Sequence, residues 1–157
     1  MAAIFQGLVL MSPAFKNLIK FPLIDYLILL PDLLFYPEKI LEVPFTSAMC
    51  TRDTEYREFM DHNPLELRSA SVKFLLISML AEIQAAWLKK NIRGPVLFQI
   101  TPLDRMVDPS ESRKIFKALA APDKTLIEYP DMFHALYIDL GREKVFGDIL
   151  EWLGKRL

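Results

Sequence analysis

Two strand-like runs in the last third of the chain, with a helix signal between them, constrain its fold more than any other feature. The run from Pro95 to Ile100 is almost continuously apolar, which is typical of a parallel strand buried on both faces. A second run covers residues 124–129. Between the runs, Asp108 and Pro109 supply an N-cap and a first helical residue, and Glu111 stands at the third position. A strand, a helix, a strand and a last segment with apolar residues at helical spacing predict an α/β fold.

The residues before Pro95 divide into a short strand, an irregular stretch and a long helix. Residues 7–11 form an apolar run that predicts a buried strand. Prolines then interrupt residues 14–63, where the pattern favours one polar helix over 51–61. From Ser71 onward, apolar residues repeat along one face of a long amphipathic helix that ends near Gly94. That face consists of Val72, Leu75, Leu76, Met79, Leu80, Ile83 and Trp87.

Composition excludes several classes of function. A net charge of −1 gives no electrostatic footprint for nucleic acid. The sequence has no P-loop, no dinucleotide-binding fingerprint and no Cys/His cluster for zinc, so we expect no cofactor and no metal. The most apolar stretch, residues 21–36, is broken by prolines and carries two Asp, and it predicts no transmembrane helix. A single cysteine and a start without the basic region of a signal peptide favour a cytoplasmic location.

Two polar residues that each follow a predicted strand are the candidate catalytic residues. Asp104 comes just after the first of the two late strands, and His134 comes just after the second. An acid can hold an imidazole in one orientation, and that imidazole can then deprotonate a serine. Asp108 is the competing carboxylate, but its N-cap position explains it without catalysis. His62 lies in a polar stretch and is interpreted as a surface residue.

Three segments of the chain resemble the monoacylglycerol lipase and lysophospholipase branch of the α/β-hydrolases. Residues 5–13 resemble the strand that follows the nucleophile elbow and its helix. Residues 95–108 resemble the strand and loop that carry the catalytic acid, and residues 124–134 resemble the strand and loop that carry the catalytic histidine. The resemblance implies that Asp104 is the acid and His134 the histidine of such a site.

The resemblance also implies an architecture: the C-terminal part of an α/β-hydrolase parallel sheet with an inserted helical cap. Residues 1–13 and 93–157 would form the core, and residues 14–92 would form a cap over an acyl-binding pocket. The apolar run at 21–36 is interpreted as packing onto the domain beneath, as a wall of that pocket or lid, or as both. One departure is Thr101-Pro-Leu, which stands where the family usually has a glycine before its acid.

The nucleophile that this family requires is not found among the 157 residues. No Gly-x-Ser-x-Gly turn occurs, and the earlier strands and oxyanion-hole loop that precede it are missing too. Ser12 ends a strand, but it lacks flanking glycines and Pro13 follows where a helix should supply N–H donors, so we reject it. Cys50 is interpreted as a small apolar filler. Because loss of the nucleophile costs about a million-fold in turnover, the chain alone is predicted to be inactive.

We therefore predict part of a serine carboxylic-ester hydrolase for monoacylglycerol-like or lysophospholipid-like esters. The expected partners are a lipid ester and either an N-terminal hydrolase half or a second copy, paired across the open edge of the strand at 7–11. The cap is expected to touch a membrane surface transiently. Two alternatives stay open: a non-catalytic module that keeps the apolar pocket, and a relative with Asp as nucleophile, such as a dehalogenase or epoxide hydrolase. The identity of the nucleophile distinguishes the serine hydrolase from the relative with an Asp nucleophile.

Overall fold

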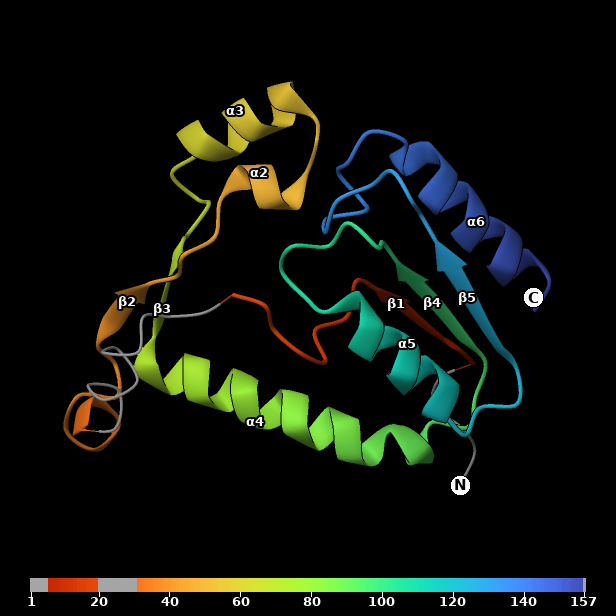
Figure 1. Cartoon of the computed structure of the whole chain (residues 1–157), viewed down its shortest axis with the longest axis horizontal. Helices are drawn as coiled ribbons and strands as arrows, with labels where there is room; N and C mark the ends of the chain where they lie inside the picture. The colour runs from red at the N-terminus through yellow and green to blue at the C-terminus, as the bar shows by residue number, and fades with distance from the viewer. Residues whose placement is uncertain (1–5, 20–30, 157) are drawn as a thin grey trace.

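A parallel sheet forms the centre of the molecule and confirms the predicted α/β class. The computed structural model describes residues 6–19 and 31–156. Within these ranges, strands β1 (Leu8–Met11), β4 (Val96–Ile100) and β5 (Lys124–Glu128) lie in the order β1-β4-β5 (Figure 1). Both pairs are parallel, with Leu8 opposite Val96 and Val96 opposite Lys124. The carboxyl ends of β4 and β5 therefore lie at the same edge of the sheet.

Strand β4 is buried along its whole length, which explains its continuous apolar sequence. Its odd-numbered and even-numbered residues face opposite layers. Phe98 packs on the α5 side between two other aromatic rings. Its ring centroid lies 6.0 Å from that of Phe15 and 5.7 Å from that of Phe116. The one polar residue of the strand, Gln99, donates hydrogen bonds to the Tyr129 hydroxyl at 2.7 Å and to the Val145 carbonyl at 3.3 Å. The buried amide nitrogen is thus satisfied on the side that carries α6.

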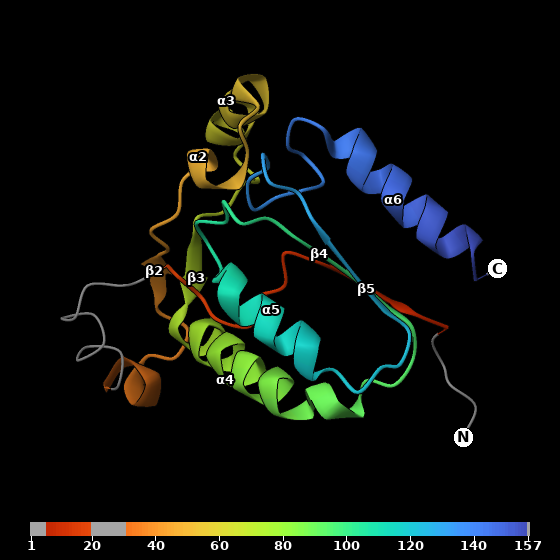
Figure 2. The same cartoon turned by 45° about the vertical axis from the view of Figure 1, so that its right-hand side comes forward.

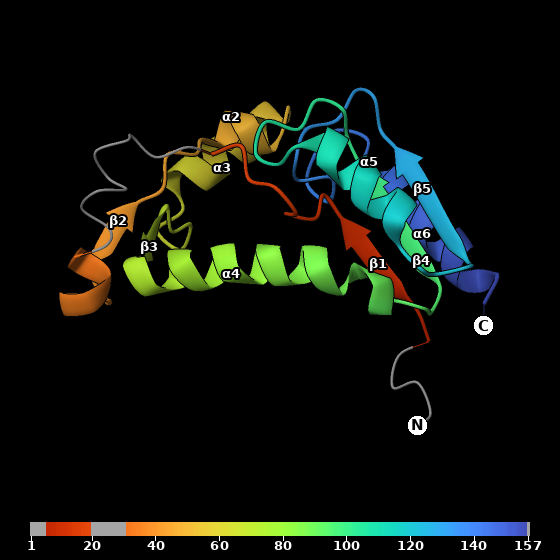
Figure 3. The ribbon, with the colours of Figure 1, turned by 60° about the horizontal axis from the view of Figure 1, so that its bottom comes forward.

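Helices α5 (Pro109–Ala118) and α6 (Arg142–Gly154) cover opposite faces of the sheet (Figure 3). Helix α5 begins as predicted, because the Asp108 carboxylate accepts from the backbone N–H groups of Ser110 and Glu111. Helix α6 follows Gly141, whose φ of 93° lies in the left-handed region that favours glycine. The two helices complete a β-α-β-α unit in the last third of the chain.

The connection between β1 and β4 contains the remaining elements. Those with described bounds are β2 (Ile40–Glu42), α2 (Ser47–Cys50), α3 (Thr54–His62), β3 (Ser69–Ser71), α4 (Val72–Leu88) and the 3-10 helix η1 (Lys89–Asn91). Strands β2 and β3 pair antiparallel in a short ribbon. Helices α2 and α3 lie beyond the carboxyl ends of the central strands (Figure 2). The boundaries of the predicted cap, residues 14 and 92, stay predictions, and residues 21–30 of the apolar run lie outside the described residues.

Helix α4 has the predicted apolar residues but does not bury them. Only Val72 is buried, whereas Met79, Leu80, Ile83 and Trp87 are at least half exposed. The helix crosses from the β2–β3 ribbon to the amino end of the sheet (Figure 3). An apolar stripe of this length is normally covered by another element. None of the helices in the two described ranges is long and apolar enough to cross a bilayer.

We predict that Phe98→Ala lowers the free energy of unfolding by about 3–5 kcal/mol, because it removes a large aromatic side chain from the sealed α5 side of the sheet. Phe35→Ala is the matched control: Phe35 is 74% exposed whereas Phe98 is 0% exposed. The control is expected to change stability by less than about 0.5 kcal/mol. Urea unfolding followed by far-UV circular dichroism measures both values, and equal losses would contradict this assignment of the core.

Candidate active site

The loops that follow β4 and β5 bring Asp104 and His134 together. The Nδ1 atom of His134 lies 2.8 Å from Oδ2 of Asp104, although the two residues are 30 positions apart in the sequence. The Asp104 side chain is 2% exposed and the His134 side chain is 23% exposed. The acid is thus closed off, while the imidazole keeps access to the surface.

Both carboxylate oxygens of Asp104 have defined partners. Oδ1 accepts from the backbone N–H groups of Met106 at 2.8 Å and Val107 at 2.9 Å, and Oδ2 faces His134. An Asp that binds backbone two and three residues ahead folds its own loop into a turn. The turn fixes the carboxylate plane, so one oxygen is always directed at the imidazole.

The remaining ring nitrogen of His134 is the atom available for chemistry. Because Nδ1 is next to Asp104, a neutral imidazole that donates from Nδ1 leaves Nε2 as a proton acceptor. Within residues 6–19 and 31–156, no hydrogen bond to Nε2 is made. A base held by a third group is the part of a nucleophilic site that this arrangement supplies.

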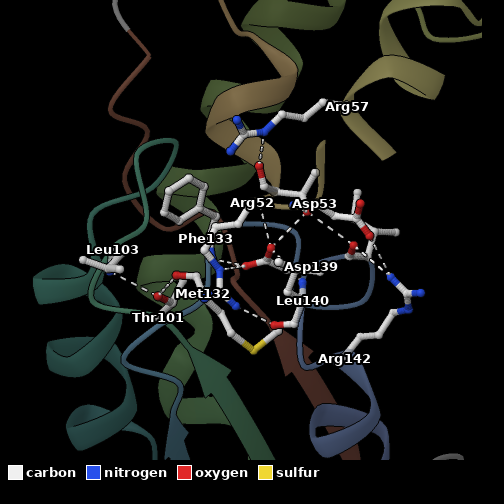
Figure 4. Close-up of polar contacts among 12 residues, drawn as sticks. Arg52, Asp53, Arg57, Thr101, Leu103, Met132, Phe133, Asp139, Leu140 and Arg142 are labelled. Atoms are coloured by element: carbon white, nitrogen blue, oxygen red, sulfur yellow. Dashed lines mark hydrogen bonds and ion pairs between the residues drawn. The ribbon is translucent and has the colours of Figure 1, made fainter. Parts of the chain in front are cut away.

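Thr101 links the acid loop to the histidine loop. Its hydroxyl accepts from the Leu103 backbone N–H at 3.1 Å and donates to the Met132 carbonyl (Figure 4). Thr101 is fully buried. In the sequence this residue stands out only as a departure from glycine, and the structure shows that its side chain binds the loop that carries His134.

Asp139 is a buried charged residue that no sequence pattern predicts. Its Oδ1 accepts from the Thr51 hydroxyl and from the backbone N–H groups of Arg52 and Leu140. Its Oδ2 accepts from Phe133 N–H and from Arg52 Nε (Figure 4). Burial opposes ionisation of this carboxyl, but the hydrogen bonds from Arg52, Phe133, Leu140 and Thr51 outweigh burial and hold its pKa below the usual value.

The other candidate residues have local explanations. Asp108 caps α5 and pairs with Lys16 at 2.8 Å, and the Lys16 ammonium and the Ser110 hydroxyl hold its pKa well below the usual range. His62 is exposed, with Nδ1 2.8 Å from the Glu58 carbonyl of its own helix. The structure thus separates both residues from the Asp104–His134 pair.

Cys50 and Ser12 are both buried. Burial raises the pKa of the Cys50 thiol, which packs beside Met60, Ala135 and Ile138. Ser12 has a φ of 39°, and its hydroxyl has no hydrogen-bond partner among the described residues. It makes no hydrogen bond to His134. In the same part of the chain, no group of three His, Cys, Asp or Glu residues is placed to hold a metal ion.

A parallel sheet between two helical layers, with an acid and a histidine on adjacent strand ends, defines an α/β-hydrolase fold. Residues 2–141 match the family described as serine aminopeptidase, S33, and the chain belongs to this family. The predicted superfamily is therefore confirmed.

Solved structures of lipolytic enzymes share this fold. A monoacylglycerol lipase of Paleococcus ferrophilus superposes with a TM-score of 0.87 at 24% identity, over 97% of this chain and 60% of that one. A soluble variant of the monoglyceride lipase of Saccharomyces cerevisiae gives 0.80 at 21% identity, over 96% of this chain and 53% of that one. The chain thus spans less than two thirds of the length of these relatives.

We predict that Asp139→Asn lowers the free energy of unfolding by about 3–5 kcal/mol at pH 7, because an amide cannot accept hydrogen bonds at both positions and leaves buried donors unpaired. The pKa of Asp139 in the folded protein lies below its ordinary value of 3.8, so its carboxylate stabilises the fold fully above that pH. This contribution is lost as the pH falls through the lower folded-state pKa.

The difference between wild type and Asp139→Asn is therefore expected to be constant from about pH 5 to 8 and to shrink below about pH 4. Urea titrations at closely spaced pH values measure the difference. A difference that stays constant down to about pH 2 would show that the ionised form of Asp139 is not what stabilises these loops.

Proposed function

We propose that this chain supplies the acid, the base and a substrate-covering segment, the cap predicted over residues 14–92, of a serine carboxylic-ester hydrolase. The observation that carries this proposal is the 2.8 Å contact between His134 Nδ1 and the closed-off Asp104 carboxylate. Membership of a serine hydrolase family supports serine, rather than aspartate, as the nucleophile. A cytoplasmic location, expected from the sequence, is part of the proposal.

In the proposed mechanism, His134 Nε2 accepts the proton of the serine hydroxyl as the oxygen attacks the ester carbonyl. Asp104 keeps the proton on Nδ1 and stabilises the imidazolium that forms. His134 then donates its new proton to the leaving alcohol, and a water activated by the same nitrogen hydrolyses the acyl-serine. The serine and the oxyanion donors come from polypeptide outside these 157 residues.

Two uncovered surfaces support docking of that polypeptide on this chain. Strand β1 pairs only with β4 in the described sheet, so its other edge presents free backbone groups. Helix α4 exposes a row of large apolar side chains, among them Ile77, Leu80, Ile83 and Trp87. An N-terminal hydrolase half would cover both surfaces. A second copy of this chain is the competing occupant.

The proposed substrates are monoacylglycerol-like or lysophospholipid-like esters. The described residues between β1 and α4 include many exposed large apolar side chains: Leu34, Phe35, Tyr36, Ile40, Phe59, Leu65 and Leu67. Such a surface suits an acyl chain and brief contact with a membrane. The relatives of known structure named above are lipases. The family description, serine aminopeptidase, gives peptide amides as a second candidate class.

We predict that a fluorophosphonate serine probe labels a polypeptide that co-purifies with this chain from its natural source, and leaves the 157-residue chain itself unlabelled. His134→Ala is expected to abolish labelling of the complex. Asp104→Asn is expected to reduce it by about 10⁴-fold, because an amide in place of the carboxylate favours the wrong tautomer of the imidazole. Gel fluorescence and intact mass measure the result.

His62→Ala is the matched control for the labelling experiment, since His62 is the other of the two histidines and is exposed on α3. It is expected to leave labelling unchanged. A folded 18.2 kDa species that is recovered alone and never labels would overturn the enzyme proposal and favour the non-catalytic binding module. Labelling of the isolated chain would point instead to a serine within it, with Ser12 tested first by Ser12→Ala.

We predict that the active complex hydrolyses p-nitrophenyl esters of medium and long acyl chains with a kcat/KM at least about 100-fold higher than that for aminoacyl p-nitroanilides. The reason is that an apolar surface binds an acyl chain but offers a charged α-amino group no compensation for its desolvation. Absorbance at the p-nitrophenol and p-nitroaniline wavelengths gives both values. A preference for the anilides would replace the ester proposal with the aminopeptidase one.

A further inference from the structure

The backbone on both sides of His134 is held by hydrogen bonds from outside its own turn. The N–H of Phe133, directly before His134, donates to Asp139 Oδ2 at 2.6 Å. The N–H of Ala135, directly after it, donates to the Cys50 carbonyl at the end of α2 at 2.9 Å. The first hydrogen bond fixes the Met132–Phe133 peptide, one residue before His134, and the second fixes the His134–Ala135 peptide. Together they restrain the backbone of His134 and so the direction of its side chain.

Asp139 itself is bound to the turn between α2 and α3. Its carboxylate accepts from the Thr51 hydroxyl at 3.0 Å, from the Arg52 backbone N–H at 2.6 Å and from Arg52 Nε at 3.1 Å. The Arg52 guanidinium also donates to the Leu140 carbonyl at 2.5 Å. These contacts join residues 87 or 88 positions apart in the sequence.

The turn that holds Asp139 is itself fixed. Arg57 donates from Nε to the Thr51 carbonyl at 2.6 Å, and the Asp53 N–H donates to the Thr51 hydroxyl at 3.1 Å (Figure 4). Asp53 also caps α3 and lies 3.4 Å from Arg142 at the start of α6. A displacement of α2 and α3 would therefore pull on Asp139, and through it on Phe133.

We propose that Asp139 is a positioning residue for His134, which transmits the position of the α2–α3 turn to the imidazole through the Phe133 N–H. The inference deepens the proposed function and rests on it for its biological meaning. It gives the substrate-covering segment a second role, because the imidazole faces Asp104 correctly only when this segment is seated on the histidine loop.

The chemistry of Asp139 argues for this role over simple packing. A fully buried carboxylate is costly, and an apolar residue of similar size would fill the same space with less penalty. Only an acceptor with two oxygens can bind, at one point, Phe133 of the histidine loop and Thr51 and Arg52 of the distant turn. The charge is thus explained by the connection that it makes.

The test is the tautomer of His134 in the purified chain, read from imidazole ¹⁵N chemical shifts by two-bond ¹H–¹⁵N NMR. The chain has two histidines, so His62→Ala assigns both signals, and His62 serves as an internal control. In the wild type, His134 is expected to be the Nδ1–H tautomer that donates to Asp104. In Asp139→Asn the ratio of Nδ1–H to Nε2–H is expected to fall about tenfold, the effect of weakening one hydrogen bond to a charged group.

Leu119→Ala is the matched control, because it opens a cavity in the core at the opposite end of the sheet with a comparable loss of stability. It is expected to leave the His134 tautomer ratio unchanged within about twofold of wild type, well below the effect of losing that hydrogen bond. An unchanged ratio in Asp139→Asn, or an equal fall in Leu119→Ala, would overturn the proposal.

Arg52→Ala is the second variant, for the case that Asp139→Asn does not fold. It removes the ion pair between the partly exposed Arg52 side chain and Asp139 and leaves the Phe133–Asp139 hydrogen bond in place. It is expected to lower the ratio about twofold to threefold, a part of the effect of losing the whole contact. No change in Arg52→Ala would then overturn the coupling to the turn. The NMR measurement does not require the nucleophilic serine, so it is independent of the labelling experiment. If labelling failed but Asp139→Asn still changed the tautomer ratio, the hydrolase proposal would be rejected and the positioning role of Asp139 would stand.

Discussion

The parallel pairing of β4 with β5 is the constraint on which the rest of the site depends. It places the ends of two strands, and the loops that follow them, at one edge of the sheet. Those loops carry Asp104 and His134, which then need only local turns to meet. The pairing is stable because β4 is buried on both faces by α5 and α6 and contributes apolar side chains to the core. The geometry of the candidate site thus follows from the packing of a core that contains neither of these two residues.

Loops at such an edge are not fixed by the sheet itself, and polar side chains supply the missing restraint. Thr101 connects the acid loop to the histidine loop, and Asp139 connects the histidine loop to the α2–α3 turn. Each side chain binds backbone groups that no strand or helix could satisfy. A buried carboxylate is a costly restraint, but it is a stiff one, because its hydrogen bonds to N–H donors are charge-assisted.

The elements with a strong local signal were predictable from the sequence. The residues of β4 and β5, the start of α5 at Asp108 and the order of acid and histidine all follow from runs and caps within a few positions. The β2–β3 ribbon has three residues in each strand, too few for an alternation of apolar and polar residues to be recognised in the sequence. Asp139 was not predictable because its partners Thr51 and Arg52 lie 87 or 88 positions away, and no pattern in the sequence joins them. The role of Asp139 was missed because its partners are far away in the sequence, and not because the contact is weak.

The exposed apolar face of α4 and the buried strand β4 are both explained by the tendency of apolar side chains to be buried. The apolar repeat of α4 was predicted correctly, yet burial of that repeat needs a second surface that the described residues do not provide. The unpaired edge of β1 points to the same requirement, because an exposed edge of a parallel sheet is normally paired or covered. One docked layer would pair β1, cover α4 and bring a nucleophile to the sheet edge where His134 lies. A docked layer of this kind, as we propose, would account together for the surfaces left uncovered by the described residues and for the open ring nitrogen.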